Sequence, residues 1–207
     1  YGALAFSIGG YGYVGTGYND NYLKDFYRFD PNAATGQQWT IVSGFGGYKR
    51  QYGTAFVIDD VAYICCGDNN GTLVDDLWKF DGSDWKQLRD IANNDSDEDY
   101  DDDYAITRAG TVSFVIDGRG YIATGTRSGV TSDYWVYDPE EDLWYGDSDD
   151  DYTPMTNVHN VSSGGSSRSY AVSFSTGKRG FVLSGSSGTS YFDDVYELLP
   201  YEQEDVD

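Results

Sequence analysis

Two aspartate clusters are the residues of this 207-residue sequence most suited to chemistry. They span residues 94–103 and 147–151. Alternating carboxylates can supply the oxygen ligands that Ca²⁺ prefers. The candidate ligands are Asp95, Asp97, Asp99, Asp101, Asp149 and Asp151. The first cluster lacks the turn glycine and the terminal glutamate of an EF-hand loop, so we favour solvated acidic loops and no cofactor, with Ca²⁺ as the alternative.

Residues for nucleophilic or redox catalysis are scarce. His159 is the single histidine, and it lies in a stretch rich in Ser, Gly and Asn. Cys65 and Cys66 are the only cysteines, and as neighbours in an expected strand they point to opposite faces, which disfavours a disulfide between them. We therefore expect a protein that is not an enzyme.

An arginine recurs at a fixed position in three of the repeat units, and an aspartate recurs at a fixed position in all four. We call these the arginine column and the aspartate column. Each arginine lies six residues before a repeated phenylalanine, and the three are Arg50, Arg108 and Arg168. The aspartates are Asp25, Asp76, Asp133 and Asp194. An arginine–carboxylate pair in each unit would tie the first strand to the third, and a ring of arginines around a ligand channel is the functional rival. We favour the structural pairing because both columns repeat with the scaffold.

The elements that position these residues come from a fourfold internal repeat. Residues 1–8, 51–58, 109–116 and 169–176 align without gaps, and the phenylalanines at the same place in each are Phe6, Phe56, Phe114 and Phe174. A glycine follows each at a constant distance: Gly17, Gly67, Gly125 and Gly185. A third strand follows in every unit, and a fourth carries Trp39, Trp85 and Trp144 in the first three. The pattern predicts four-stranded antiparallel blades at 1–49, 50–107, 108–167 and 168–207 of one propeller domain.

Alternation within the first strand explains how such blades stack. Leu4, Phe6 and Ile8 share one face, and small residues share the other. The small residue beside each repeated phenylalanine is Ala5, Ala55, Ser113 or Ser173. A bulky face set against a small one lets neighbouring blades pack closely, and burial of each phenylalanine contributes roughly 2–3 kcal/mol.

With these motifs the chain resembles the kelch-repeat β-propellers, in particular the bacterial kelch proteins described as galactose-oxidase-like. That family ends the second strand with two glycines; here the first is replaced by Thr16, Cys66, Thr124 and Ser184. The resemblance implies an all-β, kelch-type propeller. The copper-radical site of galactose oxidase requires two histidines, so the single His159 argues against that chemistry.

The ring is expected to be larger than this chain. No tryptophan-bearing strand follows residue 199, so we predict that the last blade lacks its outer strand and that the chain is a sector of a six-bladed ring. A closed four-bladed ring is one alternative. Association of the open blade edge with missing blades or with another chain is a second.

Specificity in a propeller is expected in its variable loops, here 18–23, 68–74, 127–131 and 186–191. All join the second strand to the third, so they should emerge on one rim. The candidate partner-binding residues are Tyr18, Asn19, Asn21, Tyr22, Asn69, Asn70, Arg127 and Tyr191. Such side chains suit adaptable hydrogen bonding and stacking against sugars or peptides, although ordinary turn chemistry accounts for them equally well.

A formal charge of −22 makes nucleic acid and anionic membranes poor partners, and no stretch has the roughly 20 apolar residues of a membrane span. We expect a non-catalytic binding or scaffold propeller that is extracellular, periplasmic or on the cell surface, with a protein or glycan partner. The alternative is a kelch-type sugar-active enzyme such as a sialic acid mutarotase-like epimerase.

Overall fold

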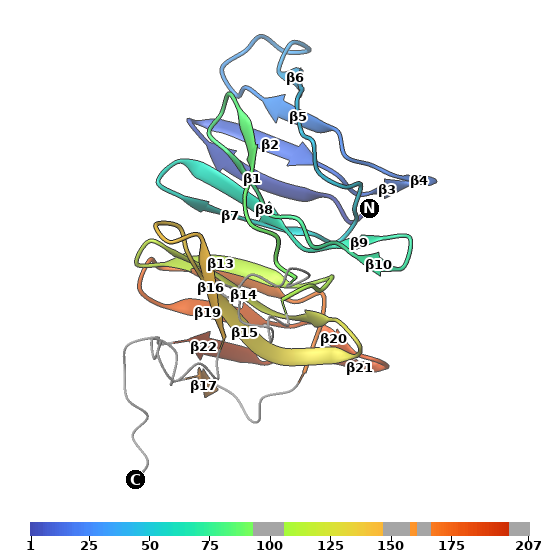
Figure 1. The fold of residues 1–207 in the computed structure, drawn as a ribbon, viewed down its shortest axis with the longest axis vertical. Helices are drawn as coiled ribbons and strands as arrows, with labels where there is room; N and C mark the ends of the chain where they lie inside the picture. Colours follow the sequence, from blue (N-terminus) through green and yellow to red (C-terminus); the bar gives the residue numbers. More distant parts are fainter. Residues whose placement is uncertain (93–105, 147–157, 161–166, 199–207) are drawn as a thin grey trace. The chain divides into compact units, whose positions relative to one another are not determined.

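The computed structural model describes residues 1–92, 106–146, 158–160 and 167–198. Every regular element among these residues is a β-strand, and no helix is present in them. The chain divides into two compact units, residues 1–109 and 110–207. Each unit contains two four-stranded antiparallel sheets, called blades 1 to 4 in chain order (Figure 1).

Blades 1 and 2 make up the first unit. Blade 1 has the strand order β1-β2-β5-β6, with bounds Leu4–Ile8, Tyr11–Gly15, Phe26–Phe29 and Trp39–Val42. Blade 2 consists of β7, β8, β11 and β12, with bounds Thr54–Ile58, Val61–Cys65, Trp78–Phe80 and Trp85–Gln87. The predicted meander and the tryptophan-bearing outer strand are therefore present in both blades.

Blades 3 and 4 make up the second unit. Blade 3 runs β13-β14-β15-β16, with bounds Val112–Ile116, Arg119–Thr126, Val130–Asp138 and Leu143–Gly146. Blade 4 contains β18, β19 and β22, with bounds Val172–Ser175, Gly180–Leu183 and Val195–Leu198.

The outer strand of blade 4 corrects one expectation. We predicted that this blade lacks an outer strand, but β17 (Val158–Asn160) pairs antiparallel with β22 at that edge. The strand precedes β18 in the chain, whereas the prediction considered only the residues after β22. Because an antiparallel edge can be paired from either direction along the chain, the missing strand comes from the connection to blade 3.

The repeated phenylalanines occupy the same place in all four blades. Each pairs across its first two strands with an aromatic residue, and the two rings stack with centroids 4.6–5.6 Å apart. The pairs are Phe6–Tyr13, Phe56–Tyr63, Phe114–Tyr121 and Phe174–Phe181. The equivalence inferred from spacing alone is thus confirmed in three dimensions.

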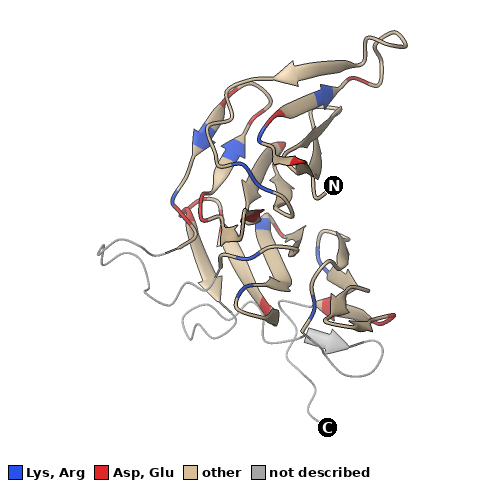
Figure 2. Cartoon of the chain, turned by 90° about the vertical axis from the view of Figure 1, so that its right-hand side faces the viewer, with Lys and Arg blue, Asp and Glu red and all other residues tan. Residues whose placement is uncertain are grey.

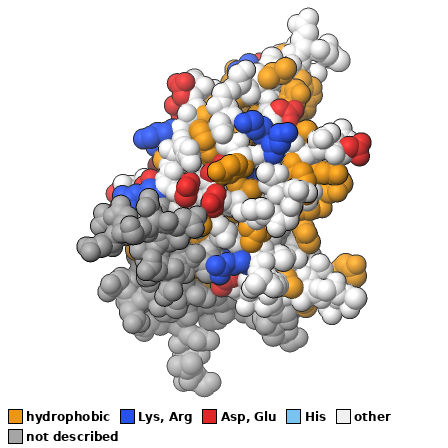
Figure 3. Space-filling view, turned by 45° about the vertical axis from the view of Figure 1, so that its right-hand side comes forward, with side chains coloured by type: hydrophobic (Ala, Val, Ile, Leu, Met, Phe, Trp, Pro, Cys, Tyr) orange, Lys and Arg blue, Asp and Glu red, His pale blue; other side chains and the backbone are white. Residues whose placement is uncertain are grey.

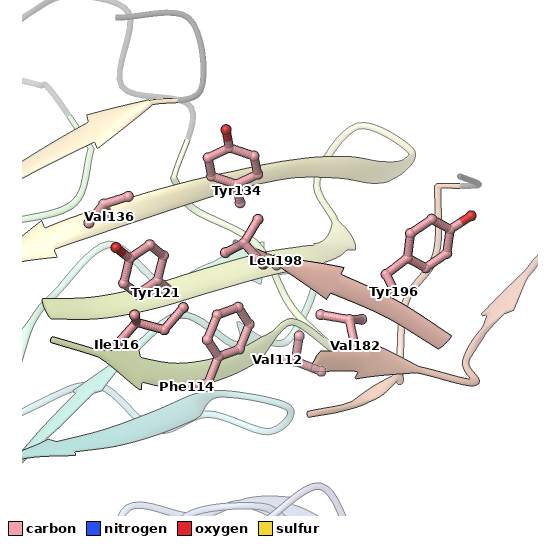
Figure 4. Packing of buried hydrophobic residues seen from close by; sticks show 10 residues of the cluster. Val112, Phe114, Ile116, Tyr121, Tyr134, Val136, Val182, Tyr196 and Leu198 are labelled. Atoms are coloured by element: carbon pink, nitrogen blue, oxygen red, sulfur yellow. The ribbon is translucent and has the colours of Figure 1, made fainter. Parts of the chain in front are cut away.

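Within each unit, the bulky face of one blade packs on the small face of the next. In the first unit Leu4, Phe6 and Ile8 form a core with Ala62 and Ile64 of blade 2, and Ala55 packs against it. The second unit repeats the arrangement with the core residues Val112, Phe114, Ile116, Tyr121, Ala123, Tyr134, Val136, Val182, Tyr196 and Leu198 (Figure 4). This is the large-against-small packing that the alternation predicts.

Candidate binding surface on the hairpin rim

Two members of the arginine column, Arg50 and Arg168, pair with aspartates of their own blades and so have a structural role. Arg50, Arg108 and Arg168 are each at most 1% exposed. Arg50 forms an ion pair with Asp76, and the Arg168 guanidinium binds both carboxylate oxygens of Asp194. An arginine this deeply buried cannot line an open ligand channel, so the functional rival is disfavoured.

Arg50 and Arg168 also fix the turn that ends the second strand of their own blades. The Nη1 atom of Arg50 donates to the Cys66 carbonyl at 3.1 Å, and that of Arg168 donates to the Ser184 carbonyl at 2.8 Å. Cys66 and Ser184 have φ angles of 61° and 59°, in the left-handed region. These paired arginines therefore hold the start of the rim loops of blades 2 and 4 in place.

The arginine main chain connects one blade to the preceding one. The amides of Gly17, Gly67 and Gly125 donate to the carbonyls of the next arginine along the chain at 2.7–2.8 Å. These hydrogen bonds place the rim loops of blades 1, 2 and 3 beside the segments that leave them for the following blade.

The rim loops themselves fold as short hairpins. They are β3 with β4 (Tyr18–Asn19, Asn21–Tyr22), β9 with β10 (Asp68–Asn69, Thr72–Leu73) and β20 with β21 (Ser186–Ser187, Ser190–Tyr191). In blade 3 the strands β14 and β15 continue into the loop instead. Asn70 and Gly71 at the tip of β9–β10 both have positive φ, which is why this turn needs the Asn-Gly pair.

Four tyrosines gather around the first hairpin. The rings of Tyr1 and Tyr18 lie 5.4 Å apart, Tyr18 and Tyr22 5.0 Å, and Tyr1 and Tyr52 6.0 Å. Tyr1 is 73% exposed, so this tyrosine cluster presents an open aromatic surface. Figure 3 shows exposed side chains of the hydrophobic class, which includes tyrosine, along the right-hand side of that view.

The neighbouring hairpin contributes a carboxylate to the cluster. Asp68 accepts hydrogen bonds from the Tyr22 hydroxyl at 3.2 Å and from the Gln51 amide at 3.3 Å. Partial desolvation and then the Asp68 charge raise the pKa of Tyr22, so its hydroxyl stays protonated and donates at neutral pH. The main chains of Gln51 and Asp68 also pair at 2.9 Å in both directions. The Tyr22–Asp68 bond joins the loops of blades 1 and 2 into one surface, and the Gln51–Asp68 bonds hold the rim loop of blade 2 against the segment that enters this blade.

The predicted rim residues fall into three groups. Tyr18 and Tyr22 meet in the tyrosine cluster, with Asn19 and Asn21 exposed beside them. Asn69 and Asn70 lie on the adjacent β9–β10 hairpin. Arg127 and Tyr191 belong to the second unit, where Tyr191 is 85% exposed and Arg127 lies in the loop between β14 and β15.

Sequence reasoning missed Tyr1, Tyr52, Gln51 and Asp68 as members of the surface. Tyr52 and Tyr170 occupy the same repeat position, and this repetition was the signal that the sequence offered. In the structure both residues have a φ of 56°. Gln51 and Asp68 meet only through pairing between two loops, which spacing along the chain does not reveal.

The predicted calcium ligands Asp95, Asp97, Asp99, Asp101, Asp149 and Asp151 all lie outside the described residues. Within the described ranges no three His, Cys, Asp or Glu side chains gather as a metal site. No helix in those ranges is long and apolar enough to cross a membrane.

The acidic excess is concentrated outside the described ranges. They lack 15 of the 35 acidic residues but hold all 13 lysines and arginines. Figure 2 accordingly shows acidic and basic residues interspersed on the described part of the chain.

Both cysteines are fully buried with free thiols. A hydrogen bond with Cys66 and then burial raise the pKa of the Cys65 thiol. The hydrogen bond with Cys65 lowers the pKa of the Cys66 thiol, but both thiols are fully buried and out of reach of a reactant in solvent.

Comparisons with known proteins bear on the fold. No family model matches the chain, and no curated protein matches it. Among solved structures it is similar to one described as the structure of YjhT, with a TM-score of 0.68 and 18% sequence identity. The match covers 96% of this chain, which spans 62% of the length of the other. At this identity the likeness shows the fold alone: the chain is an all-β propeller with four blades.

Proposed function

We propose that this chain is a non-catalytic binding propeller of the kelch type, secreted or exposed at a cell surface, whose ligand is a glycan. The observation that carries the proposal is the tyrosine cluster at the hairpin rim. Tyr1 is 73% exposed, and exposed tyrosine rings offer flat apolar faces onto which the C–H face of a sugar ring can stack.

Hydrogen-bonding groups surround those rings. Asp68 offers a carboxylate, and Asn19, Asn21 and Asn70 offer exposed side-chain amides. Amides both donate and accept, which suits the hydroxyl groups of a neutral sugar. A phosphorylated or sulfated ligand is disfavoured because Asp68 would repel it.

The runner-up function, a sugar-active enzyme, requires acid–base groups that converge on one substrate. The cluster holds a single carboxylate among its described residues, and the Tyr22 hydroxyl that faces it is held protonated. This arrangement supports binding rather than proton transfer.

The test is titration of the protein with neutral oligosaccharides, monitored by two-dimensional NMR or calorimetry. Tyr1→Ala and Tyr22→Ala should each weaken binding about tenfold, the loss expected from about 1.4 kcal/mol of stacking. Tyr48→Ala is the matched control, because Tyr48 is 58% exposed but is not part of the cluster.

Two outcomes would oppose the proposal. Equal binding by Tyr1→Ala and wild type would remove the cluster from the site. Faster interconversion of sugar anomers in the presence of the protein, followed by NMR, would favour the enzyme instead.

A further inference from the structure

Asp68 keeps one carboxylate oxygen without a partner at the edge of the tyrosine cluster. The Tyr22 hydroxyl and the Gln51 amide both donate to the same oxygen, Oδ2, at 3.2 Å and 3.3 Å. The other oxygen, Oδ1, has no hydrogen-bond partner among the described residues. Asp68 is only partly buried, so Oδ1 is available to a ligand.

The hydrogen-bond donors around Asp68 are already in use. The Tyr22 hydroxyl proton and one proton of the Gln51 amide are directed at its carboxylate. Because burial and the Asp68 charge raise the pKa of Tyr22, its hydroxyl keeps that proton at neutral pH. A ligand group that binds beside Asp68 should therefore be a hydrogen-bond donor.

Two tyrosine rings form an aromatic corner next to this carboxylate. The rings of Tyr18 and Tyr22 lie 5.0 Å apart at an interplanar angle of 73°. Tyr1 and Tyr52 continue the aromatic surface from Tyr18. The face of a tyrosine ring attracts a cation that lies within about 6 Å of the ring centre. The spacing of the cluster thus allows one cation to contact two rings.

The Tyr52 side chain is held in the cluster before any ligand binds. Its amide donates to the Gly2 carbonyl at 2.8 Å, and a Cβ atom at Gly2 would lie 3.2 Å from its ring. Tyr52 has a φ of 56°, which is unfavourable for a bulky residue. Strain of this kind persists where the surrounding structure imposes it, and it is concentrated at functional sites.

The charges near the cluster favour a cation. No lysine or arginine of the described residues forms an ion pair with Asp68. The Tyr1 amino group donates to the Tyr18 carbonyl at 2.9 Å and forms no ion pair with Asp68. The formal charge of −22 on the whole chain also attracts cations.

We propose that the tyrosine cluster selects glycans that carry protonated amines, namely oligosaccharides of hexosamines with free amino groups. The amine donates to Oδ1 of Asp68 and lies against the ring of Tyr22, while a sugar ring stacks on a neighbouring tyrosine. This inference rests on the proposed glycan-binding function and names the ligand class of the same site. The cation–π contact and a partly exposed ion pair together should tighten binding about tenfold.

Calorimetric titration with two matched ligands tests the inference. The ligands are an oligosaccharide of glucosamine and the N-acetylated oligosaccharide of the same length. At slightly acidic pH and low salt, where the amines are protonated, the first should bind about tenfold more tightly. Added salt should reduce this preference, because screening weakens an exposed ion pair and leaves stacking largely unchanged.

Asp68→Asn removes the charge and keeps an oxygen that can accept from Tyr22 and Gln51. The preference for the glucosamine oligosaccharide should fall from about tenfold to about twofold. Asp84→Asn is the matched control, because Asp84 is an exposed residue of the turn between β11 and β12 and its substitution removes the same charge. Circular dichroism shows whether each variant folds, and the salt dependence of wild type decides if Asp68→Asn does not.

Equal binding of the two oligosaccharides by wild type would overturn the inference and leave the glycan-binding function standing, whereas binding of neither would remove both. The inference also falls if Asp84→Asn loses as much preference as Asp68→Asn, because overall charge would then account for it. A linear diamine that competes as strongly as the glucosamine oligosaccharide would show recognition of an amine without a sugar, and this too would overturn the proposal.

Discussion

At the scale of the residue, the turn that ends each second strand is built from amino acids unsuited to it. Thr16, Cys66, Thr124 and Ser184 all have φ near +60°, a conformation that costs a residue with a Cβ roughly 1–2 kcal/mol. The kelch pattern places a glycine at this position, and the backbone geometry explains why. The buried Thr16 hydroxyl, in addition, has no hydrogen-bond partner among the described residues.

Thr16→Gly should therefore raise the stability of the protein by about 1 kcal/mol, since relief of strain and of an unsatisfied hydroxyl exceeds the extra backbone entropy of glycine. The adjacent Gly17→Ala is the control, because its φ is +95° and a Cβ atom would lie 2.9 Å from the Tyr1 carbonyl oxygen. Urea unfolding should move the two variants in opposite directions. A lower midpoint for Thr16→Gly would show that the threonine methyl group stabilises the turn.

The buried ion pairs make part of the folding stability of the protein sensitive to acid. Hydrogen bonds from Arg168 hold the pKa of Asp194 below its usual value. The folded pKa is thus lower than the unfolded one, so the pair stabilises the fold above the unfolded pKa of about 3.9 and the contribution is lost as pH falls through the folded value.

Asp194→Asn should destabilise the protein by about 3 kcal/mol at pH 7, because it leaves the Arg168 charge buried without a counter-charge. The penalty should shrink at pH 3, where the wild-type carboxylate is approaching protonation. Urea titrations at both values measure this difference, with Asp20→Asn as an exposed control. A penalty that is the same at both pH values would contradict the linkage.

At the scale of the element, the contact between blades depends on one missing side chain. Gly180 lies beneath Phe114, while Gly12 occupies the same position in a blade whose face is uncovered. The pair allows one substitution to be compared in a filled and an open environment.

Gly180→Val should lower the stability of the second unit by about 3 kcal/mol through overpacking against Phe114, whereas Gly12→Val should change folding stability by less than about 1 kcal/mol. Thermal unfolding of each variant is the measurement. Similar losses in both variants would indicate that backbone freedom of the glycine, rather than room for the phenylalanine, sets the cost.

The blades could be predicted from the sequence because their determinants are local. The constant distance from Phe6 to Gly17 and its equivalents fixes two strands and the turn between them. β17 escaped prediction because a three-residue strand without aromatic residues has no repeat partner. The hairpin residues Tyr18 and Tyr22 were found, but the part of the surface that depends on Gln51 pairing with Asp68 was not, because that contact lies outside the strands of the repeat, between a rim loop and the segment that enters the blade.

At the scale of the whole molecule, charge should control solubility. The chain has a formal charge of −22 at pH 7 and an isoelectric point near 4.1. Two blade faces with exposed aromatic residues would favour aggregation in a neutral protein, and mutual repulsion opposes it.

Solubility should therefore fall steeply as pH drops from 7 toward 4, because protonation of carboxylates removes that repulsion. Light scattering across this range, with far-UV circular dichroism in parallel, distinguishes association of folded protein from acid unfolding. Phe174→Ser should scatter less than wild type at the same pH. Equal scattering by the two proteins would mean that the exposed Phe174 side chain plays no part in the association.

Arg50 and Arg168 bind the preceding blade through their carbonyl groups and their own blade through their side chains. The repeat unit therefore begins most naturally at an arginine. Arg50, for example, accepts a hydrogen bond from the Gly17 amide of the blade before it through its carbonyl, while its side chain pairs with Asp76 of the blade that it opens. A module that starts at one arginine and stops just before the next keeps the arginine side chain together with the blade that it supports. At both junctions, an arginine carbonyl again meets the glycine amide of the preceding blade. Duplication, deletion or grafting of a module in this protein should therefore succeed when cut before an arginine, and fail when cut between Arg50 and Cys66 or between Arg168 and Ser184, because those side chains hold these turns.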